Sequence, residues 1–81
     1  MFVVITVEDG IILECIGFSD KQESVKHAID KCNGLLDVWY IDSLGSIDEE
    51  KKQAEKDIRK NDLYMPDDVT LTSFVVEIRE I

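Results

Sequence analysis

The sequence is short of the residues that build disulfide frameworks and metal sites. Its 81 residues include two cysteines, one histidine, one proline and four glycines. The two cysteines, Cys15 and Cys32, are too few for a disulfide framework, and we expect reduced thiols on apolar faces. A structural zinc site needs about four nitrogen or sulfur ligands, and His27 adds only one. The composition therefore predicts neither a disulfide scaffold nor a metal or other cofactor.

Basic residues are also scarce. Nine lysines and arginines stand against 18 aspartates and glutamates, which gives a net charge of −9. This surplus repels nucleic acid phosphates and anionic lipid, so direct binding to DNA, RNA or a membrane surface is not expected. The opening residues MFVVITVEDG contain no basic leader and only a short apolar run, which is not typical of a signal peptide or a membrane span. We expect a cytoplasmic protein.

Motifs for catalysis are missing as well. No glycine-rich loop has P-loop or dinucleotide spacing, and no serine lies in a nucleophile elbow. On a helix, His27 and Cys32 would be about 140° apart, which disfavours a thiol and histidine pair. Asp62, Asp67 and Asp68 offer oxygen ligands but lack the spacing and central glycine of a calcium loop. We expect that the protein is not an enzyme.

What is present predicts a single α+β domain over residues 1–81. The apolar fraction of 44% and charged fraction of 33% are those of a globular chain. Asp9-Gly10 between two apolar runs is a strong signal for a type I′ turn, which predicts a hairpin of strands 2–8 and 11–17. Two further apolar runs, residues 35–41 and 69–81, have the composition of strands.

Two helices are predicted between these strands. The first begins at a capping pair, Ser19 with Gln22, and ends at Asn33-Gly34, a left-handed stop. The second begins at Ser46 with Glu49 and covers residues 47–60. Both sets of apolar residues recur with helical spacing; they are Val25, Ala28, Ile29 and Cys32 in the first helix and Ile47, Ala54 and Ile58 in the second.

The predicted order is ββαβαβ, a two-layer sandwich with a four-stranded mixed sheet and two helices on one face. A two-residue turn places Val3, Ile5 and Val7 on one face of the hairpin, and we expect that face to meet the helices. The predicted core is Val3, Ile5, Val7, Ile12, Ile16, Val25, Ala28, Ile29, Cys32, Val38, Ala54, Ile58, Phe74, Val76 and Ile78.

The other face of the predicted hairpin is also apolar. It carries Phe2, Val4, Leu13 and Cys15, and monomers rarely leave such a patch uncovered. The pattern predicts self-association through these four residues, with a homodimer as the expected assembly.

Acidic residues are predicted to gather at one end of the domain. If each element crosses the domain once, the helix C-termini share an end with Glu8, Asp9, Asp37, Asp62, Asp67 and Asp68, next to the aromatic Tyr64. The helix dipole disfavours acid at that end, so folding gives no reason for the cluster. We interpret these seven residues as a candidate partner-binding surface. The alternative is that they are ordinary solubilising turn residues.

The sequence thus favours a small acidic protein-binding module. The leading hypothesis is an inhibitor or antidote that occupies the basic, nucleic-acid-binding surface of a nuclease, toxin or defence complex. In size, charge and simplicity of fold it resembles immunity proteins, antitoxins and phage-encoded anti-defence proteins. The alternatives are a structural homodimerisation module and a regulatory domain that binds a small ligand or metal.

Overall fold

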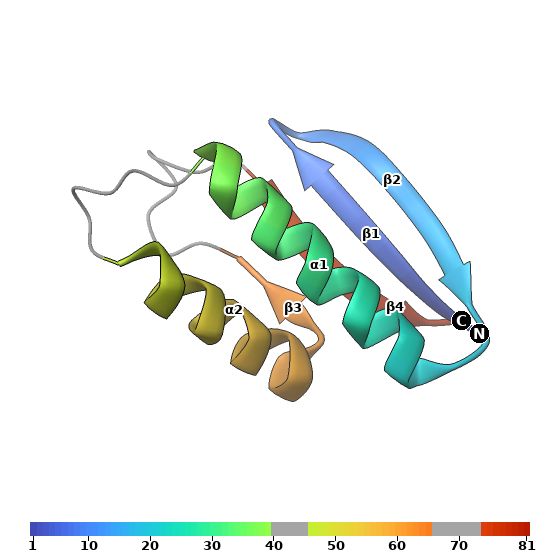
Figure 1. Cartoon of the computed structure of the whole chain (residues 1–81). Helices are drawn as coiled ribbons and strands as arrows, with labels where there is room; N and C mark the ends of the chain where they lie inside the picture. Colours follow the sequence, from blue (N-terminus) through green and yellow to red (C-terminus); the bar gives the residue numbers. More distant parts are fainter. Residues whose placement is uncertain (40–45, 66–73) are drawn as a thin grey trace.

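The chain folds into two layers, a sheet and a pair of helices. The computed structural model describes residues 1–39, 46–65 and 74–81. Within them the elements are, in chain order, β1 (Phe2–Glu8), β2 (Ile11–Phe18), α1 (Lys21–Trp39), α2 (Ile47–Asn61), β3 (Leu63–Tyr64) and β4 (Phe74–Glu80). All described strand pairs are antiparallel, in the order β2-β1-β4-β3, and both helices lie on one face (Figure 1). The predicted α+β class is confirmed, whereas the predicted mixed sheet is not found.

A tight turn at Asp9 and Gly10 joins β1 to β2. Their φ angles are 52° and 77°, and a type I′ turn requires positive φ at both central residues. The hairpin turn predicted from this dipeptide is therefore confirmed.

A β-bulge interrupts the hairpin soon after the turn. Val7 pairs with Ile12, but the preceding Thr6 pairs with Glu14, so Leu13 is an extra residue on β2. Because side chains alternate between the two faces of a strand, one extra residue moves every later side chain of β2 to the other face. The bulge thus turns Glu14 toward the helices.

The predicted strand at residues 35–41 is wrong over the part that the structure describes. Residues 35–39 continue α1, which runs through Asn33 and Gly34 without a break, and residues 40 and 41 lie outside the described residues. The apolar helical spacing does not stop at Cys32, because Leu36 follows one turn later and is fully buried. Packing of that stripe overrides the local stop signal. The observed order is therefore ββααββ, not ββαβαβ.

The observed capping residues of the helices agree in part with those predicted from the sequence. Ser46 caps α2 as predicted, its side chain accepting a hydrogen bond from the Glu49 amide, and Asp62 closes the helix with φ of 58°. At the start of α1 the capping residue is Asp20 rather than Ser19, since Asp20 Oδ1 accepts from the Gln22 amide at 2.9 Å. Aspartate and serine are both favoured at this position, so the prediction missed by one residue.

The last predicted strand is found over the part that the structure describes. β4 covers Phe74–Glu80, and residues 69–73 of the predicted strand lie outside the described residues. β4 occupies the middle of the sheet between β1 and β3, although three of its last four residues, Glu77, Arg79 and Glu80, are charged. The short edge beside it is the two-residue β3.

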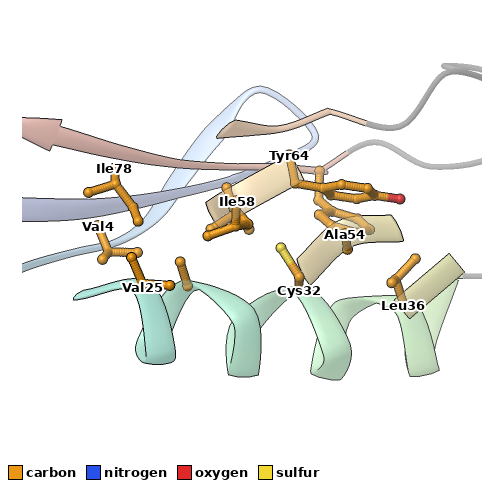
Figure 2. Close-up of a cluster of buried hydrophobic side chains, with 11 residues drawn as sticks. Val4, Val25, Cys32, Leu36, Ala54, Ile58, Tyr64 and Ile78 are labelled. Carbon is orange, nitrogen blue, oxygen red and sulfur yellow. The ribbon is translucent and has the colours of Figure 1, made fainter. Parts of the chain in front are cut away.

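The core lies between the helix layer and one face of β1, β3 and β4 (Figure 2). Nine of the fifteen predicted core residues are buried, whereas Ile12 and Val38 expose 65% and 74% of their surface. The remaining four are half-buried: Ile5, Val7, Ile16 and Ile29. Val4, Leu36 and Tyr64 are buried residues that the prediction missed. The cluster consists of Val4, Val25, Ala28, Cys32, Leu36, Ala54, Ile58, Tyr64, Phe74, Val76 and Ile78.

The predicted assignment of the two hairpin faces is wrong. Val4 pairs with Ile78, and both are buried against the helices. Since residues directly opposite in a sheet share a face, the alternate residues Val3, Ile5 and Val7 of β1 point away from the helix layer. The face expected to be buried is the one without helices among the described residues.

Candidate functional site

The sheet face opposite the helices is mostly apolar and is not covered by a described helix (Figure 1). Strand register places seven apolar residues there, which we call the open face: Val3, Ile5, Val7, Ile12, Cys15, Leu63 and Val75. Their exposure differs, for example 7% for Val3 and 65% for Ile12. Val7 pairs with both Ile12 and Val75, so the apolar side chains adjoin one another across three strands. A contiguous apolar area of this kind on a small protein is typical of an interaction surface.

One ion pair interrupts the open face. Glu77 and Arg79 follow Val75 at every second position of β4 and so lie on the same face. Arg79 Nε and Glu77 Oε1 are 2.5 Å apart. The pKa of Arg79 is raised because it donates a hydrogen bond to Glu77 and lies in the field of that carboxylate. Paired charges beside apolar residues give this face both an apolar contact area and a polar element.

The surplus of negative charge lies outside the helices. α1 contains three acidic and three basic residues, and α2 contains five of each. Arg79 is the one basic residue in the four described strands, against Glu8, Glu14, Glu77 and Glu80. The sheet and the connecting segments therefore carry the whole net charge, while the helix layer is neutral overall.

The predicted acidic cluster is only partly assembled. Glu8 and Asp9 lie at the hairpin turn, and the C-terminal part of α1 with Asp37 lies at the same end of the molecule (Figure 1). Asp37 forms an ion pair with Lys51, with 2.6 Å between the carboxylate and the amine. Asp67 and Asp68 lie outside the described residues.

Asp62, another member of the predicted cluster, lies at the other end of the molecule. Asp62 follows α2 and pairs at 2.7 Å with Lys21, the first residue of α1, near the end of β1 that is far from the hairpin turn. The prediction assumed a strand between the helices, which would make them run in the same direction. Without that strand α2 runs back along α1 (Figure 1), which carries Asp62 to the other end.

Tyr64 belongs to the core and is not an exposed anchor. It is 2% exposed, its ring lies 5.7 Å from that of Phe74, and its hydroxyl donates a 2.6 Å hydrogen bond to Glu50. Burial and this bond raise the pKa of Tyr64 well above its ordinary value. The hydroxyl holds α2 to the sheet and is a structural contact.

The predicted self-association patch is divided between the two faces. Val4 is fully buried, and Phe2 packs against the core with Lys21 Nζ 5.3 Å from its ring centre. Leu13 and Cys15 are exposed. The patch is divided for two reasons. The predicted faces of β1 are exchanged, and the bulge turns the second half of β2 over relative to the predicted register.

A polar cluster that the sequence reasoning missed lies between β2 and α1. Glu14 accepts hydrogen bonds from His27 Nε2 at 2.6 Å and from Lys31 at 2.8 Å, and the His27 ring lies 5.2 Å from that of Phe18. His27 and Lys31 are one helical turn apart, which places them on one face of α1. Two features of the sequence could have predicted this cluster: the four-residue spacing of His27 and Lys31 on a helix, and the single glutamate, Glu14, in an otherwise apolar strand.

These residues border a groove of about 480 Å³ between β2 and α1. Thr6, Leu13 and Leu35 also line it, and Thr6 Oγ1 is buried without a hydrogen-bond partner among the described residues. Both oxygens of Glu14 are already bound, Oε1 by His27 and Oε2 by Lys31, so the carboxylate is held in place as part of the link between sheet and helix.

The pH dependence of stability should report this link. The pKa of Glu14 lies below its ordinary 4.5, chiefly because Lys31 and then His27 donate to the carboxylate. A lowered folded-state pKa stabilises the fold above the unfolded value, and this contribution is lost as pH falls through the folded value. We expect Glu14→Gln to reduce the free energy of unfolding by about 1 kcal/mol near neutral pH.

Urea unfolding of the wild type and Glu14→Gln at about pH 7 and about pH 3 measures this contribution, since the two conditions bracket the titration. The two proteins should differ at the higher pH and converge at the lower one. A difference of the same size at both values would show that the carboxylate charge contributes nothing.

The cysteines differ in their surroundings. Cys32 is fully buried, and burial together with Asp57 raises its thiol pKa to about 12, which makes it a poor nucleophile. Cys15 is exposed on β2, and both cysteines are free thiols.

The described residues offer neither a metal centre nor a membrane-spanning helix. They contain no group of three or more histidine, cysteine or acidic residues arranged to hold a metal ion. In the described part of the chain, no helix combines the length and apolar character needed to cross a membrane. No protein-family model, curated protein or solved structure matches the chain.

Proposed function

We propose that the protein is a small acidic protein-binding module of the inhibitor or antidote type. Its partner presents a basic surface of the kind used to bind nucleic acid, and the open face with its acidic surroundings covers that surface. The observation that supports this proposal is the apolar open face on a sheet whose strands and turns carry the surplus negative charge, beside a neutral helix layer.

The physical case combines two contributions. Protein interfaces typically have an apolar centre and a polar rim, and the open face supplies the first. Glu8 and Asp9 at the hairpin turn supply acidic groups at its border. Complementary charge accelerates encounter with a basic partner, whereas apolar burial mainly slows dissociation. The cytoplasmic location expected from the sequence, where thiols stay reduced, suits the two free cysteines.

The proposal assigns no catalytic step and no cofactor to the protein. The expectation that it is not an enzyme stays a prediction, as does the absence of direct nucleic acid or membrane binding. Of the residues first considered as partner contacts, Glu8 and Asp9 remain central to the proposal. Asp37 is a further contact at the same end of the molecule.

The test begins with capture of the partner from an extract of the source cells, followed by binding kinetics with the purified pair. Association should slow markedly as salt rises, because salt screens the attraction between the acidic residues at the turn and the basic partner. Glu8→Gln with Asp9→Asn should lower the association rate and flatten its salt dependence. Asparagine tolerates the positive φ of residue 9.

The matched control is Glu23→Gln with Asp30→Asn on α1, which removes the same formal charge from exposed residues of the helix layer. Equal slowing by both double variants would mean that only net charge matters. That result, or a partner whose association is indifferent to salt, would refute the proposed surface.

A second pair of variants tests the apolar contact. Val7→Thr with Val75→Thr keeps the shape and β-propensity of two neighbours on the open face but adds hydroxyls. Dissociation should be faster by roughly tenfold, equivalent to about 1.4 kcal/mol. Val38→Thr, at an exposed position of α1, should leave the dissociation rate unchanged. If Val38→Thr speeds dissociation and the sheet variant does not, the contact lies on the helices.

A further inference from the structure

β2 forms a long outer edge of the sheet. It covers eight residues, Ile11–Phe18, and within the described chain it pairs with β1 alone. Figure 1 shows no described element beyond it. An edge strand presents unpaired N–H and C=O groups along its free side, which are a template for another strand. The opposite edge, β3, has only two residues.

The second half of the edge carries little of the protection that usually prevents such pairing. In the first half, Ile11, Ile12 and Leu13 expose 65%, 65% and 57% of their surface. Natural edge strands are typically interrupted by lysine, proline, a β-bulge or an inward-pointing charge. β2 has a bulge at Leu13 and an inward-pointing Glu14, but residues 15–18 contain neither charge nor proline. Its single charged residue, Glu14, is bound on the helix side by His27 and Lys31.

We propose that β2 pairs antiparallel with β2 of a second copy of this chain, about a two-fold axis, and joins the two sheets. A second copy fits because antiparallel self-pairing is self-complementary by symmetry. The bulge at Leu13 leaves residues 14–18 as the regular pairing segment, with Ile16 at its centre. In this register Ile16 lies opposite Ile16 of the second copy, and the small Cys15 of each copy lies opposite Gly17 of the other.

The helix layer leaves room for this approach. α1 packs mainly over β1 and β4 rather than over β2, so the backbone edge is accessible in the plane of the sheet. A two-fold axis perpendicular to the sheet keeps the helices of both copies on one side. The open faces then form one continuous surface, and the charge contacts of Glu14 stay intact.

Salt dependence separates this pairing from binding to a basic partner. Each copy has a net charge of −9, so the two copies repel at long range and salt weakens the repulsion. Self-association should therefore strengthen as salt rises, opposite in sign to the proposed binding of a basic protein. The inference stands independently of that proposed function, and either can fail alone.

The test measures mass and backbone protection on the same samples. Sedimentation of the wild type at roughly 100 μM and moderate salt should give a dimer, as expected for a Kd in the micromolar range. Hydrogen exchange should slow with increasing protein concentration in residues 14–18, the proposed pairing segment, and stay unchanged in β4, which is paired on both sides. A monomer at this concentration, or a dimer without added protection of β2, would overturn the proposal.

A matched pair of double variants locates the contact. Cys15→Lys with Gly17→Lys introduces charge within the proposed pairing segment, and Val38→Lys with Met65→Lys does so elsewhere, also at exposed residues. Both change the net charge equally. The edge variant should weaken self-association at least tenfold, about 1.4 kcal/mol, and the control should not. Equal effects in both would contradict an edge contact, and the exchange measurement on the wild type remains decisive if a variant fails to fold.

Discussion

Replacing Val4 with aspartate is expected to prevent the protein from folding at room temperature. Val4 is fully buried between the sheet and α1 (Figure 2), and a carboxylate there has no cationic partner among the buried residues. An unpaired buried charge destabilises a fold by roughly 3–5 kcal/mol. A domain of this size has a total stability of about 4–12 kcal/mol at typical values per residue, so most of it would be lost.

Ile12→Asp is the control for this prediction. Both variants place the same charge in neighbouring strands, but Ile12 exposes 65% of its surface on the open face, so the cost should stay below about 1 kcal/mol. Circular dichroism and urea unfolding compare the two proteins. If Val4→Asp folds and Ile12→Asp does not, the helices cover the opposite face from the one described.

The face of the hairpin could not be read from the sequence because both faces are apolar. The turn itself was predictable, since Asp9-Gly10 satisfies a local backbone requirement. The bulge at Leu13 was not, because one inserted residue leaves no compositional signal yet exchanges the faces of everything after it. The ion-paired position of Glu14 follows from that exchange.

The predicted position of Asp62 within the acidic cluster is wrong for a topological reason. Local signals located both helices approximately, but their relative direction depended on whether a strand lay between them. Continuation of α1 to Trp39 removed that strand and reversed α2, which placed Asp62 beside Lys21. The end of the domain at which a charged residue lies is thus harder to predict from the sequence than the helix or strand that contains it.

The same reasoning explains why the interaction surfaces were only partly foreseen. An uncovered apolar sheet face was expected, and one exists, but with Val3, Ile5 and Val7 in place of Phe2 and Val4. Leu13 and Cys15 remain exposed and lie on the edge strand. The proposed self-association through the edge depends on strand order, which could not be read from the side-chain pattern alone.

Leu36→Ala should lower the free energy of unfolding by about 2–5 kcal/mol. Leu36 is fully buried in the core cluster, where it extends the stripe of α1 one turn beyond Cys32 (Figure 2). Truncation removes apolar contacts and leaves a cavity in a small core. Val38→Ala, two residues further on, should change stability by less than about 0.5 kcal/mol, because Val38 exposes 74% of its surface. Urea unfolding measures both.

Gly34→Ala completes the test, because it separates a continuous helix from the turn that Asn33-Gly34 suggests. Gly34 lies inside α1, and a Cβ there would meet no atom within 4 Å. Alanine should therefore raise stability by about 0.5–1 kcal/mol, since glycine is the poorer helix former. A left-handed turn would give the opposite sign, because alanine is strained at positive φ. A strand at residues 35–39 would also bring Val38 and Leu36 to the same face of the sheet, with similar costs on truncation. A large loss for Leu36, a negligible one for Val38 and a gain at Gly34 are together consistent only with the helix.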